Sequence, residues 1–168
     1  MKNFEVLSVF DLLMCYIKEG RIHLDPSRHT EVTTYHDPCN YGRKSLKAFR
    51  HGYFNEGRWI TQKCCPDFVD MYPNRDGNYC CGAGGGAWAM PFHEERIFYG
   101  RFKARQIRNT KAHLVIAPCH NCRDQIMKSL NKEYDIGIEV KYLWELVADS
   151  LILPGATGQE GNGSSQDD

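Results

Sequence analysis

The chain has 168 residues, a length typical of one domain, and 42% of its residues are hydrophobic, which is enough for an apolar core. Its 21 Lys and Arg residues balance 21 Asp and Glu residues, and this zero net charge argues against a nucleic-acid-binding protein, because such proteins usually carry a basic excess. No run of about 18 apolar residues is present, so we expect no segment that spans a membrane by itself.

The first third of the chain predicts a helix, a strand and a second helix. Apolar residues recur at three- and four-residue spacing over residues 6–17, which predicts a helix. The β-branched residues of segment 31–35 predict a strand. We expect a helix over residues 40–51, with Leu46 and Phe49 facing the core.

The middle of the chain is rich in turn-forming residues. Several Gly, Asn and Pro residues predict loops over residues 52–79, with short elements near 59–60 and 68–69. The glycine run within residues 79–86 favours an irregular loop. A helix is expected over residues 94–108, because two acidic residues at its start suit the positive end of the helix dipole.

The last third of the chain alternates strands and helices. The nearly all-apolar segment 113–117 predicts a strand buried on both faces. A helix, a strand and a last helix are expected over residues 126–134, 138–142 and 143–151. The polar, Gly/Ser-rich segment 154–168 has nothing to bury, so we expect it to be disordered.

This order of elements predicts an α/β domain over residues 1–153, with a mainly parallel sheet and flanking helices. A helix is an unusual first element for such a fold. Because a missing upstream strand would explain it, we expect the chain to be part of a longer polypeptide.

Eight cysteines are the most unusual feature of the composition. An even number is consistent with disulfides, but residues 1–20 are amphipathic and do not form a secretory signal. We therefore expect a cytoplasmic protein, in which clustered cysteines more often bind metal or carry out redox chemistry. The eight residues are Cys15, Cys39, Cys64, Cys65, Cys80, Cys81, Cys119 and Cys122.

Five of these cysteines are expected to converge. Cys39 and Cys119 each follow a predicted strand, and in open α/β sheets ligands bind at the carboxyl ends of strands. Cys122 follows Cys119 at a helix start, where free N–H groups favour the thiolate. Cys80 and Cys81 precede the glycine run, whose flexible backbone would let both reach one centre. A tetrahedral zinc takes four ligands, so five thiolates favour a multinuclear iron–sulfur centre.

Three separated motifs resemble the CCG cysteine-rich domain family, which includes a subunit of heterodisulfide reductase. They are HDPC at 36–39, CCGAGG at 80–85 and PCHNC at 118–122. The longer runs NYCCGAGGGAW at 78–88 and IAPCHNCRDQI at 116–126 are most similar to the iron–sulfur subunit of the membrane redox complex of sulfate reducers.

The resemblance implies a noncubane [4Fe–4S] cluster that exchanges electrons with disulfide-type sulfur substrates. A zinc site with one spare thiol is the alternative. The chain has no C-x-x-C-x-x-C ferredoxin run, so the resemblance implies partner subunits with ferredoxin-like clusters, cytochromes or membrane segments, and a small sulfur-carrier protein as a further partner. The ligands implied by the family are Cys39, Cys80, Cys81, Cys119 and Cys122.

Ionisable residues flank the motif and are candidates for proton delivery when a disulfide accepts electrons. His36 and His120 are the catalytic candidates, and His93 lies nearby in sequence. Asp37 could serve in the same way or cap a helix beside the first motif cysteine. His120 could instead donate a hydrogen bond to a cluster sulfur.

Other features have simpler interpretations. We expect Cys64 and Cys65 to be non-ligand cysteines in a partly buried loop, with an alternate ligand or a substrate-reactive thiol as the alternative. We expect Cys15 to be a packing residue.

Basic residues in the helix predicted over 94–108 are expected to form a solvated face, with steering of an acidic partner as the alternative. Aromatic residues near that helix are expected in the core or at a subunit interface. The basic residues are Arg96, Arg101, Lys103, Arg105 and Arg108, and the aromatic residues are Trp88, Phe92, Phe98, Tyr99 and Phe102.

The sequence therefore predicts an iron–sulfur oxidoreductase subunit that acts on a disulfide or trisulfide within sulfur metabolism. Two alternatives remain. One is an electron-relay subunit of a lactate- or glycerol-type dehydrogenase, and the other is a zinc-binding structural module.

Overall fold

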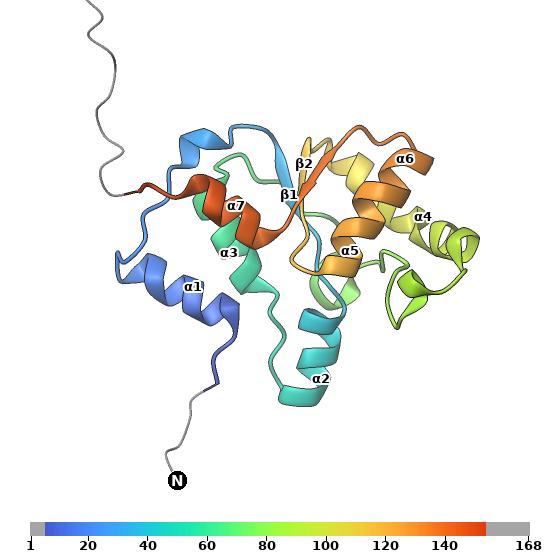
Figure 1. Ribbon diagram of the computed structural model, residues 1–168, viewed down its shortest axis with the longest axis horizontal. Helices are drawn as coiled ribbons and strands as arrows, with labels where there is room; N and C mark the ends of the chain where they lie inside the picture. Colours follow the sequence, from blue (N-terminus) through green and yellow to red (C-terminus); the bar gives the residue numbers. More distant parts are fainter. Residues whose placement is uncertain (1–5, 154–168) are drawn as a thin grey trace, which may run out of the picture.

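The computed structural model describes residues 6–153, which form an α/β fold around a three-stranded parallel sheet (Figure 1). The strands are β1 (Thr33–Tyr35), β2 (Leu114–Ile116) and β3 (Glu139–Lys141), in the order β1-β2-β3. Tyr35 aligns with Ile116, and Ile116 aligns with Lys141. The fold class predicted from the sequence is confirmed, whereas the predicted disordered tail lies outside the described residues.

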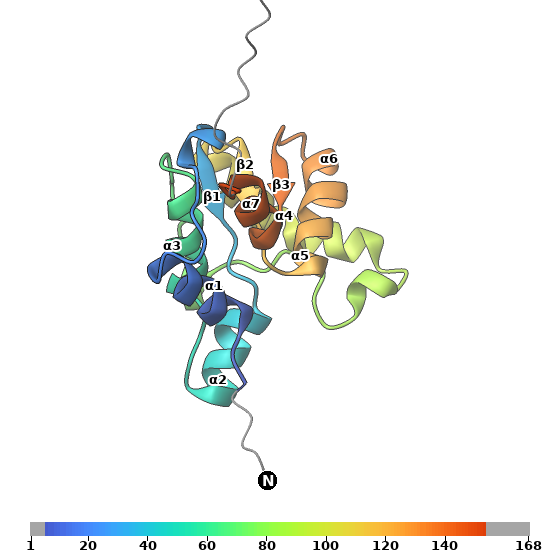
Figure 2. The same cartoon turned by 60° about the vertical axis from the view of Figure 1, so that its left-hand side comes forward.

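Helices cover both faces of the sheet (Figure 2). On one face, α1, α3 and α7 pack around Leu114 and Ile116, and on the other, α4 and the helical segment after β2 pack around Val115. All three residues of β2 are fully buried, which confirms the prediction of a strand buried on both faces. The α-helices are α1 (Val9–Lys18), α2 (Ser45–Phe49), α3 (Asn55–Cys64), α4 (His93–Thr110), α5 (His120–Asp124), α6 (Asn131–Glu133) and α7 (Leu143–Ser150).

Two π-helical segments lie next to the cysteine motifs. Asn40–Lys44 follows Cys39 and leads into α2, and Gln125–Leu130 joins α5 to α6. Such wide turns are rare, and they occur frequently at functional sites. Both lie within a few residues of a motif cysteine, so the irregular turns mark the same end of the sheet.

The short element predicted near residues 59–60 is part of a longer helix, α3 (Asn55–Cys64), so the prediction of loops over residues 52–79 is wrong in that part. The buried positions of α3, Gly57, Ile60 and Cys64, follow helical spacing, but the small Gly57 hides the pattern in the sequence. Gly57 allows α3 to pack directly on β1, because a Cβ at this position would collide with the Tyr35 hydroxyl.

The prediction that Leu46 and Phe49 face the core is also wrong. Their exposed fractions are 41% and 79%. The helix α2 that carries them lies at the lower end of the molecule, away from the sheet (Figure 1). The buried residue of this region is Gly42, in the preceding π-helical turn.

Candidate metal centre

The carboxyl ends of β1 and β2 position two of the cysteine motifs. Because Tyr35 and Ile116 are aligned in adjacent parallel strands, the residues that follow them leave the sheet at the same edge. Cys39 then opens the first π-helical segment, and Cys119 is the N-cap of α5. This placement agrees with the general rule that ligands bind outside the carboxyl ends of parallel strands.

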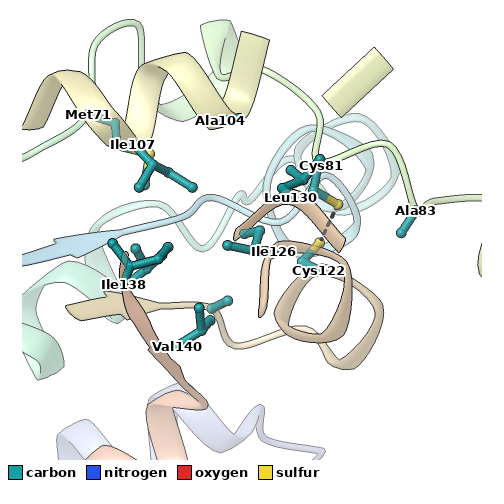
Figure 3. Close-up of a cluster of buried hydrophobic side chains, with 12 residues drawn as sticks. Met71, Cys81, Ala83, Ala104, Ile107, Cys122, Ile126, Leu130, Ile138 and Val140 are labelled. Carbon is teal, nitrogen blue, oxygen red and sulfur yellow. Dashed lines mark hydrogen bonds between the residues drawn. The ribbon is translucent and has the colours of Figure 1, made fainter. Parts of the chain in front are cut away.

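The glycine-rich segment brings the remaining motif to this edge. The Sγ atoms of Cys81 and Cys122 are 3.3 Å apart, and both residues are buried (Figure 3). Cys39 and Cys80 line one small cavity with them. Cys122 also faces Cys119. The structure thus brings all five motif cysteines together.

Glycines allow this close approach. Gly82 has a φ of +93°, and a Cβ at this position would collide with the Arg96 carbonyl oxygen of α4. A Cβ on Gly100 of α4 would in turn lie 2.8 Å from the Cys81 carbonyl oxygen. The segment of Cys81 and Gly82 therefore rests directly on the backbone of α4, which fixes the position of the Cys81 sulfur.

The sulfur atoms are too close together to carry independent charges. The Cys122 thiol and the N–H groups of Cys122 and Asn121 lower the pKa of Cys119 to about 6. The thiols of Cys122 and Cys80 hold the pKa of Cys81 well below its usual value, whereas the pKa values of Cys80 and Cys122 are raised. Ionisation of the whole set requires a cationic centre among the sulfurs, so the donor set fits a thiophilic metal group.

His36 lies inside this centre. One ring nitrogen of His36 and the sulfurs of Cys81 and Cys122 all lie within 4.8 Å of one another, and the three residues are buried. Neither ring nitrogen has a hydrogen-bond partner among the described residues. Burial lowers the pKa of His36, and Lys103 lowers it further. A buried imidazole without a partner fits a site that is completed by a bound group.

His120 occupies a different environment. Its side chain is 69% exposed, and Nδ1 contacts the Tyr142 hydroxyl. Its Nε2 lies 3.8 Å from an Asp124 carboxylate oxygen. His36 is therefore an internal residue of the site, whereas His120 lies at the surface between two motif cysteines.

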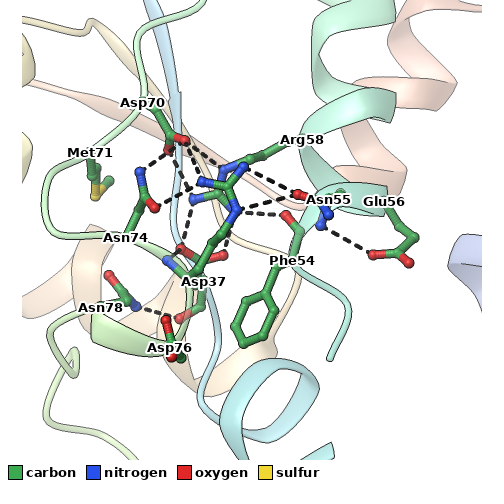
Figure 4. A network of polar contacts seen from close by, with 12 residues as sticks. Asp37, Phe54, Asn55, Glu56, Arg58, Asp70, Met71, Asn74, Asp76 and Asn78 are labelled. Carbon is green, nitrogen blue, oxygen red and sulfur yellow. Dashed lines mark hydrogen bonds and ion pairs between the residues drawn. The ribbon is translucent and has the colours of Figure 1, made fainter. Parts of the chain in front are cut away.

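Asp37 is a structural anchor, so the prediction of a helix N-cap is wrong. Its two carboxylate oxygens accept hydrogen bonds of 2.5 and 2.7 Å from the Arg58 guanidinium (Figure 4). A third comes from the backbone N–H of Arg75, at 2.8 Å. Arg58 also pairs with Asp70, with N–O distances of 2.8 and 2.9 Å. The network holds the HDPC segment against α3, a helix that is longer than the short element predicted near residues 59–60.

The expected solvated face is wrong for two of the five basic residues of α4, which are buried, whereas Arg105 and Arg108 are exposed and Arg101 is partly exposed. Arg96 donates to Gln125, and its guanidinium lies 4.6 Å from the ring centroid of Trp88. Lys103 is fully buried and donates to Asn78 and Gln106. Both lie on the same face of α4 as Gly100, but that face contains too few apolar residues to predict burial from the pattern.

The remaining cysteines do not contribute to the centre. Cys64 and Cys65 are fully buried in the core cluster that contains Leu114, on the face of the sheet covered by α1, α3 and α7. Burial raises the pKa of Cys65 to about 11 and also raises that of Cys64. Cys15 is exposed on α1, so its predicted packing role is wrong.

The aromatic residues of α4 are at the surface rather than in the core. Phe98, Tyr99 and Phe102 are 56%, 65% and 39% exposed. The Arg101 guanidinium lies 3.8 Å from the ring centroid of Phe98 and 4.1 Å from that of Phe102. The other expectation for these residues, a subunit interface, stays a prediction.

The CCG cysteine-rich domain matches residues 33–127, more than half of the chain, and the chain therefore belongs to this family. This match contains all five motif cysteines. No solved structure matches the chain.

Longer curated proteins contain a similar segment. The Hdr-like menaquinol oxidoreductase iron–sulfur subunit 2 of Archaeoglobus fulgidus is 28% identical over 154 residues, which cover 88% of this chain and 26% of that protein. One subunit of the dihydromethanophenazine:CoB–CoM heterodisulfide reductase of Methanosarcina mazei is 30% identical over 152 residues, 89% of this chain and 35% of that protein. The EtfAB:quinone oxidoreductase of Syntrophomonas wolfei is 27% identical over 117 residues, 69% of this chain and 15% of that protein. The chain thus spans about a third or less of each of these relatives.

Within residues 6–153, no helix is both long enough and apolar enough to cross a membrane.

Proposed function

We propose that this chain is the iron–sulfur module of a heterodisulfide reductase-like oxidoreductase, and that it holds a noncubane [4Fe–4S] cluster. The observation that carries the proposal is the convergence of five cysteine side chains from three separate segments at one edge of a parallel sheet. Iron–sulfur groups are held by thiolates, and five sulfurs exceed the four that a single zinc takes. The proposed ligands are Cys39, Cys80, Cys81, Cys119 and Cys122.

When bound, the cluster would supply one-electron transfer to or from a disulfide or trisulfide substrate, together with Lewis-acidic iron. The side chains of this protein have distinct tasks around it. His36 is buried, and one of its ring nitrogens lies near the sulfurs of Cys81 and Cys122, so we assign it to a hydrogen bond with a sulfur atom there. His120 is exposed, so it can deliver a proton to a thiolate product at the surface.

The proposal extends to the setting of the reaction. The runs 78–88 and 116–126 resemble those of the sulfate-reducer complex, which favours a role in dissimilatory sulfur metabolism and a substrate presented by a small sulfur-carrier protein. The names of the relatives describe subunits and quinol or quinone oxidoreductases, which favours ferredoxin-like, cytochrome or membrane partner subunits. Association with a membrane would then depend on those partners.

The first experiment is anaerobic purification followed by iron, sulfide and zinc analysis, with EPR spectra recorded after oxidation in the presence of a thiol. About four iron atoms per chain are expected. Their loss in Cys81→Ser, with no loss in the matched control Cys15→Ser, would support the proposed ligands, because Cys15 is exposed on α1. About one zinc and no iron would overturn the iron–sulfur assignment in favour of the structural zinc module.

A second candidate function is electron relay without sulfur chemistry, which the quinone oxidoreductase relative favours. The reduced, iron-loaded chain can be mixed with a small organic disulfide while thiol release is measured. Reductive cleavage releases two thiols for two electrons and two protons. Thiol release that slows in His120→Ala at unchanged iron content supports the main proposal, whereas a chain that takes up electrons and releases no thiol is a relay.

A further inference from the structure

Lys103 has an unusual environment for a lysine. The side chain is fully buried, and its Nζ donates to the amide oxygens of Asn78 and Gln106. The Met71 sulfur lies 3.5 Å from the same Nζ. Within residues 6–153, no carboxylate forms a salt bridge with Lys103. Buried charges are normally paired, so a protonated Lys103 requires a negative partner.

The position of Lys103 points to the cysteine centre as that partner. Asn78 lies two residues before Cys80, and its side-chain amide donates to the Asp37 carbonyl oxygen at 2.6 Å. Through Asn78, Lys103 is thus connected to the HDPC segment (residues 36–39) and to the segment that contains Cys80 and Cys81 (the CC segment). Burial lowers the pKa of Lys103, and the negative groups whose charge opposes this shift are Asp37 and the sulfurs of three motif cysteines, Cys81, Cys122 and Cys80.

Of these groups, Asp37 is already neutralised. Both of its oxygens accept from the Arg58 guanidinium. The thiolates have no comparable cation in contact: the other residues lining their cavity include only one permanently charged cation, Arg43, whose guanidinium donates to the backbone carbonyls of Asp76 and Asn78. Arg96, the other buried cation of α4, donates to Gln125, and its guanidinium lies over the Trp88 ring. Within residues 6–153, Lys103 is thus the buried cation of α4 whose contacts are only neutral amide oxygens and a thioether sulfur.

We propose that Lys103 is the internal counter-charge of the thiolate-held cofactor and that it raises the reduction potential of that cofactor. The inference rests on the proposed iron–sulfur function. Reduction adds one electron, supplied by an external reductant, and no proton moves at Lys103. A buried positive charge stabilises the more negative, reduced state, and neither water nor salt screens it strongly.

The test compares two neutral variants with a matched control. Lys103→Met removes the charge, and Lys103→Gln removes the charge but keeps a hydrogen-bond donor for Asn78. Arg105→Met removes one positive charge from an exposed position of the same helix. Each protein is loaded anaerobically, its fold is checked by circular dichroism, its iron is counted, and its midpoint potential is measured by EPR-monitored titration.

Both neutral variants are expected to lower the equilibrium constant for one-electron reduction at least tenfold, about 59 mV, while Arg105→Met leaves it unchanged. Folded neutral variants that fail to retain iron would also support the counter-charge. Native iron content with a native potential in either neutral variant would overturn this inference alone. A wild-type chain without iron would overturn the proposed function itself.

If neither neutral variant folds, the charge state of Lys103 is measured in the iron-loaded wild-type chain instead. The ¹³Cε resonance of Lys103 at pH 8 then reports its charge state directly. A resonance typical of a protonated amine in the loaded chain supports the proposal. A resonance typical of a neutral amine overturns it.

Discussion

Arg58 is the residue on which the first motif depends most for its position. Its guanidinium pairs with Asp37 and Asp70, and its side chain is 6% exposed. In Arg58→Met, the buried Asp37 loses its partner, so we expect the free energy of unfolding to fall by about 3–5 kcal/mol. Urea unfolding of the variant measures this loss.

A surface pair provides the control for Arg58. Arg21 and Glu19 are 3.9 Å apart, with side chains that are 56% and 55% exposed. Arg21→Met should change the free energy of unfolding by less than about 1 kcal/mol. Equal effects of Arg58→Met and Arg21→Met would show that the buried network does not hold the HDPC segment in place.

Lys103 makes the free energy of unfolding of the metal-free chain depend on pH. Burial lowers its pKa from 10.5 to about 7, so between these values the unfolded chain binds a proton that the folded chain has released. The free energy of unfolding therefore rises with pH across this range. Cys119, with a pKa lowered from 9.0 to about 6, contributes a change of the same sign between those two values.

We expect the metal-free, reduced chain to gain stability from about pH 7 to 8, because the cysteines with raised pKa values oppose the trend only as the pH approaches their unfolded pKa of 9.0. Lys103→Met should reduce the slope by up to about 1.4 kcal/mol per pH unit. Urea unfolding at several pH values gives the slopes, and Lys128→Met is the exposed control. An unchanged slope in Lys103→Met would contradict the lowered pKa of this lysine.

At the scale of the elements, α4 supports the CC segment through a glycine. Alanine normally stabilises a helix interior relative to glycine, by about 1 kcal/mol. At Gly100, however, a Cβ would lie 2.5 Å from Leu130 Cδ2 and 2.8 Å from the Cys81 carbonyl oxygen. We expect the collision to dominate, so that Gly100→Ala lowers the free energy of unfolding by about 1–3 kcal/mol and reduces iron retention.

The control for Gly100→Ala is Asn109→Ala, at an exposed position of the same helix. This variant gains helix propensity without a collision, so its stability should be unchanged or slightly higher. Thermal unfolding and iron analysis compare the two variants. A stabilised Gly100→Ala that retains its iron would show that the CC segment can move away from α4.

The elements that the sequence predicts correctly are those with a simple apolar pattern. The all-apolar run of β2 and the spacing in α1 and α7 predict their type. The full length of α3 escapes prediction because Gly57 stands at a buried position, where close contact with Tyr35 replaces an apolar side chain. The burial of Lys103 is not predicted either, because this burial depends on a hydrogen bond to Asn78, which only the folded chain brings near.

The convergence of the motif cysteines is predictable because it depends on topology rather than on side-chain detail. Strands that run parallel place their carboxyl ends at one edge, so a parallel sheet predicts Cys39 and Cys119 at the same edge, and the pairing of β1 with β2 makes them neighbours. The sequence identifies His36 as a candidate site residue. It does not predict that both ring nitrogens of His36 lack a hydrogen-bond partner among the described residues. Nothing in the sequence pattern predicts the counter-charge opposite the thiolates.

For the whole molecule, a bound cofactor would connect segments that are distant in the chain. A group that binds only the folded state raises its stability by an amount that grows with binding affinity. We expect removal of the metal by a chelator under reducing conditions to lower the unfolding temperature, and anaerobic reloading to restore it. Cys81→Ser, which lacks a proposed ligand, should show a much smaller difference, and an equal difference in both proteins would contradict binding at this site.

The spacing of the cysteine segments also determines when the centre can form during synthesis. Cys39 precedes β2 in the chain, whereas Cys122 follows β2, so the ribosome makes Cys39 before Cys122. The two segments meet when β1 pairs with β2, and the CC segment reaches them once α4 is in place. A cofactor held by all five cysteines would therefore bind only after the chain has been synthesised beyond Cys122 and β1 has paired with β2.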